Sequence, residues 1–503
     1  MDQVSVRSAR GVIGACMLVI ASASVMLAGF QYVVTGMQLE FAFSTDTANA
    51  LSFMPSAASL LVVFIAGSLA DRWGPRRLLL TAITLFIGGA VVVAAAPGMT
   101  WVIIGRVLDG IGGVTMAIVA LAVVNTAARE PRQRAKVFAV YAAVTPAAFM
   151  LAPAVAAFVV QSAGWRAGML PGIIIGFVAL AGVWVYVPRQ AGGRPGELLT
   201  PLLAGLVLAG LALAVTTLPI SPVLAQVAAA VAVLSLLALM VIMRRTANPT
   251  LDLGWVRQRG LVIVTIAVAV TAMPNLFFYT NLLLQYRYQV PLIQIALLIM
   301  VPQAIVAAAC LLSGPVSSKI GPVRASIAAL FVSAAASTST LMVTSGAPIW
   351  VPILALSICA SPAAFVVGPI TNALLVRAPA DASGAASSMR KATWTLGNVL
   401  GGAIIGTIAF QAFESKLAGI LQADGLDWRQ AHVIAREIRD GAVVDELAAR
   451  VSEPIAQISL IDRGPGLLQA QSYAFWVMGV ASAVAYLLAA VLMVAYARRT
   501  SAR

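Results

Sequence analysis

The chain has 503 residues, of which 61% are hydrophobic and 10% are charged, and its mean hydropathy is +0.97. Soluble domains carry about 25% charged residues, so this composition excludes a soluble fold and indicates a bilayer around the apolar surface. The net charge of +14 does not indicate a nucleic-acid binder, because Lys and Arg are concentrated in short loops and tails.

Runs of about twenty apolar residues predict fourteen transmembrane helices. In chain order they are 11–36, 47–70, 77–97, 100–127, 136–161, 167–188, 200–218, 222–243, 259–285, 292–314, 324–344, 349–376, 385–411 and 468–496. The first run begins like a signal peptide, but its apolar character continues to about Val34. We therefore interpret it as an uncleaved first helix.

The distribution of Lys and Arg predicts the orientation. An even number of spans places both termini on one side, and the short connections on the other side contain only Arg166 and Arg287. By the positive-inside rule both termini are cytoplasmic, and we expect a multi-pass protein of the bacterial plasma membrane. The net acidic segment 412–467 is then external, and its pattern predicts two short amphipathic helices. We interpret it as a packed cap, with an external gate or partner surface as the alternative.

A loop motif occurs twice in the chain. Residues 67–77 read Gly-Ser-Leu-Ala-Asp-Arg-Trp-Gly-Pro-Arg-Arg, and a weaker copy follows 247 residues later, at 314–324. A motif repeated between hydrophobic spans indicates a duplicated transporter. We expect a first six-helix half at 1–190, two additional central helices with linkers at 191–257, and a second half at 258–503 that includes the loop 412–467.

Several stretches resemble the major facilitator superfamily, and specifically its 14-span drug:proton antiporter family. They are the loop 67–77, Arg106–Gly113 with its Arg-x-x-Asp-Gly-x-Gly pattern, Pro146 with 152–157, Trp165-Arg166 and 382–390. The resemblance implies an all-α integral membrane protein with the major facilitator fold: two six-helix halves and two extra central helices. It also implies proton-driven multidrug efflux of hydrophobic or cationic amphiphilic compounds, with the proton gradient as energy source and no cofactor.

Asp109 is the one acid deep in a predicted span, and Arg106 lies three residues before it on the same helix face. A charge at the bilayer centre costs roughly 2.5–3.5 kcal/mol, so a role is expected. We expect Asp109 to take and release the proton and Arg106 to respond to its charge. The alternative is a permanent ion pair that holds helices together. The family commonly has an acid in the first helix; this chain has none at 26–34, and we interpret Glu40 as a solvated interface residue.

The loop and the fifth helix are candidates for the conformational change. The expected switch residues are Gly67, Asp71, Arg72, Gly74, Arg76 and Arg77. The glycines permit a tight turn, Asp71 is expected near the N-terminus of the helix that starts near Gly384, and the arginines bind headgroups. The alternative is that the loop only determines topology. Pro146 and Pro153 are the expected hinge.

Inward polar and aromatic residues are the candidate cavity: Gln31, Tyr32, Asn275, Tyr279, Asn281, Trp394 and Asn398. Each is alternatively an interhelical hydrogen bond or interface anchor. We expect Arg390 and Lys391 to mark the cytoplasmic end of their helix.

The sequence predicts no catalytic residue and no metal site. The chain has one histidine, His432, and lacks a phosphate-binding loop and a Gly-x-Ser-x-Gly elbow, so we do not expect an enzyme. Expected partners are a small amphiphilic substrate and membrane lipids, with no nucleic acid, and the protein is expected to be a monomer. Two alternatives stay open: an exporter or flippase of a lipid or other large apolar molecule, and a non-transporting scaffold or sensor.

Overall fold

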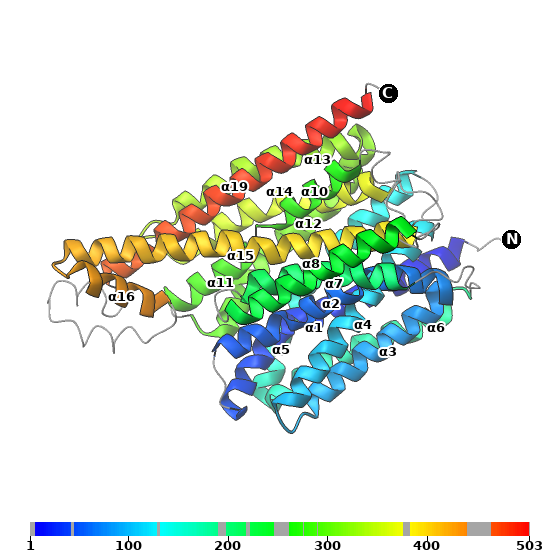
Figure 1. Ribbon diagram of the computed structural model, residues 1–503, viewed down its shortest axis with the longest axis horizontal. Helices are drawn as coiled ribbons and strands as arrows, with labels where there is room; N and C mark the ends of the chain where they lie inside the picture. Colours follow the sequence, from blue (N-terminus) through cyan, green and yellow to red (C-terminus); the bar gives the residue numbers. More distant parts are fainter. Residues whose placement is uncertain are drawn as a thin grey trace.

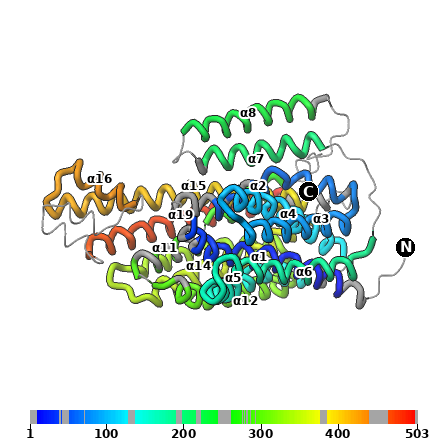
Figure 2. The backbone as a smooth tube through the Cα atoms, turned by 90° about the horizontal axis from the view of Figure 1, so that it is seen from below, coloured from blue at the N-terminus to red at the C-terminus, as the bar shows by residue number. Residues whose placement is uncertain are grey.

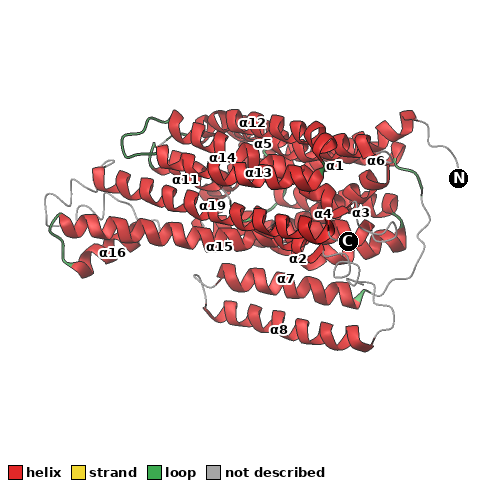
Figure 3. Ribbon diagram, turned by 90° about the horizontal axis from the view of Figure 1, so that it is seen from above, coloured by secondary structure: helices red, strands yellow, loops and turns green. Residues whose placement is uncertain are grey.

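The computed structural model describes residues 6–41, 45–127, 131–189, 198–217, 222–245, 261–274, 276–288, 290–375, 383–439 and 464–501. Every regular element in these ranges is a helix, as Figure 3 shows by its uniform colour. The helices are α1 (Val6–Phe41), α2 (Thr45–Trp73), α3 (Pro75–Ala94), α4 (Met99–Ala127), α5 (Pro131–Ala167), α6 (Leu170–Tyr186), α7 (Leu199–Thr217), α8 (Pro222–Arg245), α10 (Leu261–Ala272), α11 (Leu276–Tyr286), α12 (Leu292–Ile320), α13 (Pro322–Ser337), the 3₁₀ helix η1 (Thr338–Met342), α14 (Trp350–Leu375), α15 (Ser383–Ala423), α16 (Trp428–Arg439) and α19 (Pro465–Ser501).

The bundle has two distinct ends. Both termini lie at one end, which we call the terminus end, and α16 lies at the opposite end, which we call the α16 end (Figure 1). We refer to α1–α6 as the N-terminal half and to α10–α15 with α19 as the C-terminal half. The sequence-predicted domain boundaries stay a prediction.

The count of fourteen spans is not confirmed, although each predicted run coincides with helix. In the described residues, ten helices are long and apolar enough to cross a membrane, and four further apolar helices are shorter. One shorter helix has a clear cause: the predicted span 259–285 divides into α10 and α11 around Pro274. Proline has no backbone N–H and interrupts the helical hydrogen bonds at that point.

The two copies of the loop motif have the same backbone geometry. Gly74 has φ 80° and ψ 146°, and Gly321 has φ 86° and ψ 152°. Each glycine precedes a proline that begins the next helix, Pro75 of α3 and Pro322 of α13. A positive φ is accessible to glycine without the steric cost that a Cβ adds. The repeat seen in the sequence is therefore a repeat in structure.

The halves pack against each other toward the terminus end. Val63 of α2 and Phe138 of α5 share one hydrophobic cluster with Val264 of α10 and Leu374 of α14. By contrast, one large cluster contains residues of α1–α6 alone, and the cluster around Tyr279 contains residues of the C-terminal half alone. The largest shared cluster thus joins the halves near the termini.

The helices α7 and α8 form a separate layer on one side of the bundle (Figure 2). The backbone of α7 approaches α2 closely, since a Cβ on Gly205 would lie 2.1 Å from the carbonyl oxygen of Leu61. The outer helix, α8, exposes large apolar side chains along its length, among them Val223 and Leu234. Such a surface is expected where lipid tails surround a helix.

The segment 412–467, which the sequence predicts to be external, begins with a helical hairpin. α16 packs on the end of α15 through Ala431 and Ala435, in a cluster that also contains Leu417. Arg439 of α16 donates to Glu414 of α15 at 2.5 Å. The first predicted amphipathic helix is thus confirmed as α16, whereas the second, at 443–451, lies outside the described residues.

Candidate functional site: a buried ion pair linked to a helix bend

Arg106 and Asp109 form an ion pair inside the N-terminal half. The two side chains lie one turn apart on α4, and Arg106 Nη1 donates to Asp109 Oδ2. Arg106 is 0% exposed and Asp109 is 5% exposed. Two opposite charges in contact avoid most of the cost of burying either one alone. The structure therefore brings together the two residues that the sequence singled out for proton coupling; their role stays a prediction.

A proline explains how Arg106 is connected to a second helix. Pro55 lies inside α2 and has no N–H to donate to the carbonyl of Leu51, four residues earlier. Arg106 Nε donates to that same carbonyl oxygen at 3.3 Å. The guanidinium thus replaces the missing backbone donor. Beside this contact Gly110 of α4 packs on Pro55, where a Cβ would lie 2.5 Å from the Pro55 carbonyl oxygen.

A third helix completes the surroundings of Arg106. The guanidinium carbon lies 3.7 Å from the centre of the Phe30 ring of α1, a distance typical of a cation–π contact. Nη2 has no hydrogen-bond partner among the described residues. The arginine therefore connects α1, α2 and α4 and still has donor capacity. A change in the charge of Asp109 would reach all three helices through this one side chain.

The predicted switch loop adjoins the same helix, α2, at its terminus end. Gly67 and Gly74 are buried, whereas Arg72 and Arg77 are exposed. Arg76 Nη2 donates to the Trp184 carbonyl oxygen at 2.5 Å, and its predicted binding of headgroups stays a prediction. The backbone of Asp71 lies in α2, but its side chain is outside the description, so its predicted contact with the start of α15 stays a prediction.

The fifth-helix prolines lie within continuous helix. α5 runs from Pro131 to Ala167 and contains Pro146 and Pro153. Its pronounced change of direction occurs instead at Gly164, with φ 82° and ψ 168°. The hinge role of the two prolines stays a prediction.

The candidate cavity residues fall into separate groups. Trp394 and Asn398 lie one turn apart on α15; with its amide oriented to suit its neighbours, Asn398 accepts from Trp394 Nε1 and donates to the Ala272 carbonyl oxygen, both at 2.9 Å. Tyr279 packs against Phe410 with ring centres 6.1 Å apart.

The four other candidate cavity residues are Gln31, Tyr32, Asn275 and Asn281. Gln31 is exposed and Tyr32 is half-buried, both on α1 in the other half. Asn275 and the side chain of Asn281 lie outside the description. A cavity shared by the seven residues therefore stays a prediction.

The sequence missed the environment of Arg390. This side chain lies seven residues after the start of α15 and is 8% exposed, so it is buried near the end of its helix. Its Nε donates to Thr371 Oγ1 of α14 at 3.2 Å, and its guanidinium carbon lies 5.8 Å from the Trp394 ring centre. The spacing of Arg390, Trp394 and Asn398, four residues each, is the sequence signal that predicts a shared face.

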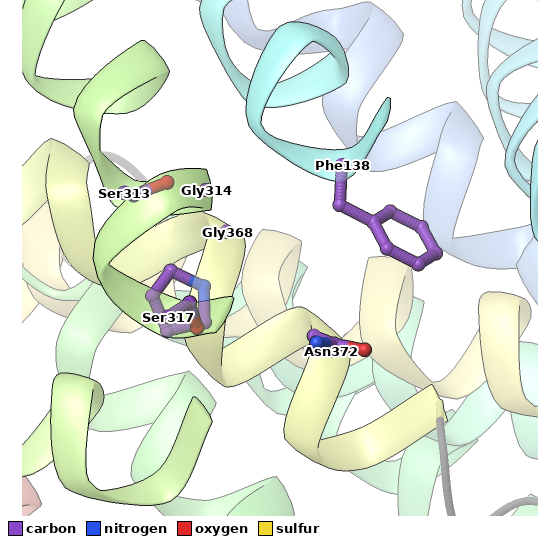
Figure 4. Close-up of a pocket in the computed structure, with 7 residues that line it drawn as sticks. Phe138, Ser313, Gly314, Ser317, Gly368 and Asn372 are labelled. Carbon is purple, nitrogen blue, oxygen red and sulfur yellow. The ribbon is translucent and has the colours of Figure 1, made fainter. Parts of the chain in front are cut away.

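A hollow lies near this region, between α5, α12 and α14 (Figure 4). It is lined by Phe138, Ser313, Ser317 and Asn372, together with small residues. Ser317 Oγ and Asn372 Oδ1 are buried and have no hydrogen-bond partner among the described residues. The contact between the halves therefore contains buried polar atoms without a hydrogen-bond partner in the described structure.

Each half contains its own set of polar side-chain contacts toward the α16 end. Glu40 accepts from Arg166 at 2.6 and 2.7 Å and from Trp165 Nε1 at 2.7 Å. The hydrogen bonds from Arg166, and then from Trp165, lower the pKa of Glu40 to about 2. In the other half Arg287 donates to Ser472 Oγ and to the Thr344 and Ser345 carbonyl oxygens. Glu40 is thus a bonded residue and not only a solvated one.

The described residues contain no group of three or more His, Cys, Asp or Glu side chains placed to hold a metal ion. The three cysteines, Cys16, Cys310 and Cys359, are buried and free, as expected of small apolar side chains.

The family model and the relatives that match this chain indicate the same family. The family model of the Major Facilitator Superfamily matches residues 14–402. The multidrug resistance protein Stp of Mycobacterium tuberculosis (strain CDC 1551 / Oshkosh) is 26% identical over 424 residues, 80% of this chain and 76% of that protein. A methylenomycin A resistance protein of Streptomyces coelicolor (strain ATCC BAA-471 / A3(2) / M145) is 25% identical over 360 residues, 70% of this chain and 75% of that protein.

Solved structures agree on the fold. The human organic anion transporter MFSD10 (TETRAN) matches with a TM-score of 0.61 and 14% identity, over 96% of this chain and 99% of that chain. The proton:xylose symporter XylE matches with a TM-score of 0.57 and 15% identity, over 96% and 95%. At these identities the likeness concerns the fold alone.

Proposed function

Because this chain belongs to the Major Facilitator Superfamily, we propose that it is a secondary active transporter that exports amphiphilic drugs in exchange for protons by alternating access. The observation that carries the proposal is the buried Arg106–Asp109 pair and its link to the carbonyl that Pro55 leaves free in α2. The relatives whose names describe multidrug and methylenomycin A resistance support the drug class.

In this proposal the proton acts at a carboxylate oxygen of Asp109. A proton that binds there neutralises the acid, so the attraction that holds Arg106 is lost and Arg106 becomes a buried cation without a counter-charge. Such a charge costs roughly 2.5–3.5 kcal/mol in a bilayer, which drives a rearrangement. Since Arg106 Nε also bonds the Leu51 carbonyl, α2 moves with it, and α2 continues into the loop 67–77. Release of the proton on the other side restores the pair.

Alternating access needs two arrangements of the halves. The shared hydrophobic cluster at the terminus end supports closure at that end, with access from the α16 end. We propose that both termini are cytoplasmic, which makes this an outward-facing arrangement in a bacterial inner membrane. We further propose fourteen spans, made of the ten long helices and the shorter apolar helices. The transporter works as a monomer, without a cofactor.

The second candidate is an exporter or flippase of a lipid. The absence of an acid in the middle of α1 favours it, because cation recognition then lacks its usual partner in this family. A scaffold or sensor without transport is the third candidate.

The test uses sealed liposomes with an acidic interior, purified protein and an enclosed pH-sensitive dye. Lipophilic cations, neutral drugs and a lipid analogue are added outside in turn. We expect substrate-dependent proton efflux that Asp109→Asn abolishes, and that Asp427→Asn, the same change at an exposed acid, leaves intact.

The alternatives predict different results. Movement of the lipid analogue without proton efflux supports the flippase. No transport by a correctly inserted wild-type protein supports the scaffold. Efflux that survives Asp109→Asn contradicts the coupling role.

A further inference from the structure

We propose that the C-terminal half contains an anion-binding subsite around Arg390 and Lys391 of α15. It takes the carboxylate, sulfonate or phosphate group of an amphiphilic cargo. The inference rests on the proposed transport function and names the charge class of its substrate.

The first step is that the positive charges of Arg390 and Lys391 are not paired with an acid in the described structure. Arg390 is 8% exposed, and Lys391 beside it is half-buried. The ion pairs among the described residues include Arg106–Asp109, Arg166–Glu40 and the pairs of Glu414 with α16, and neither Arg390 nor Lys391 takes part in an ion pair there. Two adjacent cations repel each other, and among the described side chains no acid forms an ion pair with either of them. A bound anion supplies the counter-charge.

Cations that only determine topology look different in this protein. Arg498 and Arg499 on α19 are also adjacent and also lie at the terminus end, but both are exposed. The burial of Arg390 beside a half-buried Lys391 therefore needs another explanation.

The second step is the donor set. In the described structure Arg390 has one hydrogen bond, from Nε to Thr371 Oγ1, at 3.2 Å. That bond fixes the plane of the guanidinium, while Nη1 and Nη2 keep their donors. The two terminal nitrogens of an arginine match two oxygens of a carboxylate, sulfonate or phosphate.

Two serine hydroxyls extend this donor set. Ser387 Oγ and Ser388 Oγ are fully buried and have no hydrogen-bond partner among the described residues. They precede Lys391 by four and three residues, so they share its side of α15. A buried hydroxyl without a partner is rare in folded proteins, and an oxyanion accepts its hydrogen.

The third step is the apolar wall beside the charges. The Trp394 ring lies 5.8 Å from the Arg390 guanidinium carbon, and Asn398 fixes the indole through Nε1. Tyr141 of α5, in the N-terminal half, lies close enough to Arg390 to interact with it electrostatically. Tyr141 and Trp394 both pack against the hydrophobic cluster that joins the halves. Cations beside aromatic rings at this seam suit a molecule with an anionic head and an apolar body.

The test compares three fluorescent probes with one apolar body: pyrenebutyrate (anionic), pyrenebutylamine (cationic) and pyrenebutanol (neutral). Binding is measured by fluorescence titration of full-length protein in phosphatidylcholine nanodiscs. We expect pyrenebutyrate to bind the wild type about tenfold more tightly than the other two, a difference of about 1.4 kcal/mol.

The variants test whether the buried cations cause this preference. Arg390→Gln/Lys391→Gln is expected to lose it, and the charge-keeping exchange Arg390→Lys/Lys391→Arg is expected to retain most of it. Arg498→Gln/Arg499→Gln removes the same charge from an exposed pair and is expected to change nothing. The inference is overturned if the wild type binds all three probes with equal affinity. It is also overturned if Arg390→Gln/Lys391→Gln and Arg498→Gln/Arg499→Gln reduce the preference for pyrenebutyrate equally.

Two further experiments distinguish a lipid headgroup from a cargo as the bound anion, and this inference from the proposed transport function. If lipid headgroups occupy the subsite, phosphatidylglycerol in the nanodisc weakens pyrenebutyrate binding to the wild type but not to Arg390→Gln/Lys391→Gln. Because binding needs no proton gradient, Asp109→Asn is expected to keep the preference. A wild type that exchanges protons for drugs but shows no preference loses this inference alone, and one that shows the preference without any exchange loses the proposed function alone.

Discussion

In the N-terminal half the buried cation Arg106 has an acid one turn away on its own helix, whereas in the C-terminal half the buried cation Arg390 has a threonine hydroxyl and an aromatic ring as neighbours. The backbones of the halves are repeats: Gly74 and Gly321 adopt the same turn, and Pro55 and Pro302 lie at equivalent positions of α2 and α12, 247 residues apart. At the position that corresponds to Arg106, α14 has Ile353. The buried cation of the N-terminal half is thus paired with an acid, whereas that of the C-terminal half is not paired with one in the described structure. In our two proposals the proton acts at the first cation and the cargo's charge at the second.

The largest expected difference concerns stability. Arg106→Leu leaves Asp109 buried without its cation and is expected to destabilise the protein by about 3–5 kcal/mol. Arg390→Leu removes a buried cation that has no acid partner in the described structure, so we expect an unchanged or higher Tm. Thermal unfolding of both variants in one detergent checks this. Arg106→Leu/Asp109→Leu should recover most of the loss, and equal losses at Arg106 and Arg390 contradict the comparison.

A smaller loss is expected where α4 meets α2. A Cβ at Gly110 would lie 2.5 Å from the Pro55 carbonyl oxygen, so Gly110→Ala must displace backbone and is expected to cost about 1–3 kcal/mol. Gly402 of α15 has no atom within 4 Å of such a Cβ, and Gly402→Ala serves as the control. Similar melting temperatures for the two variants would show that the α2–α4 contact adapts.

Pro55→Ala tests the link between the ion pair and α2. Alanine restores the N–H that the Leu51 carbonyl lacks, so Arg106 Nε loses its acceptor. We expect proton-driven transport to fall about tenfold, equivalent to about 1.4 kcal/mol, with insertion unchanged. Pro302→Ala in the other half, where no arginine occupies the matching position, is expected to have less effect. Transport rates in liposomes decide, and equal effects would remove the link from the mechanism.

The smallest effect is expected at Glu40. The pKa of its carboxyl is about 2 in the folded protein, against an ordinary value of 4.5, so the contact with Arg166 stabilises the fold fully above about pH 4.5. That contribution is lost as the pH falls from about 4.5 to about 2. The wild type should therefore melt slightly above Glu40→Gln at neutral pH, with the difference vanishing in that window. The pair is exposed, so a large difference would be unexpected.

The sequence predicted most of the helices because a bilayer demands apolar runs of a set length. It also identified Arg106 and Asp109, since i,i+3 spacing on a helix is a local property. It missed the contact with Leu51, because that contact joins residues far apart in the chain through the bond that Pro55 omits. It placed Arg390 at a helix end because hydropathy shows where a charge lies along a span but not which neighbours surround it.

Helix α15 has 41 residues, about 60 Å of helix, and a bilayer core is about 30 Å thick. A helix of this length is about twice as long as the bilayer core is thick, so we expect its far end, with α16, to project beyond the membrane. In the proposed alternating-access cycle the halves rotate about the midplane, and the end of α15 then moves farther than any point inside the bilayer. A fluorophore at an exposed position there, such as Val433, is therefore expected to report which side of the protein is open.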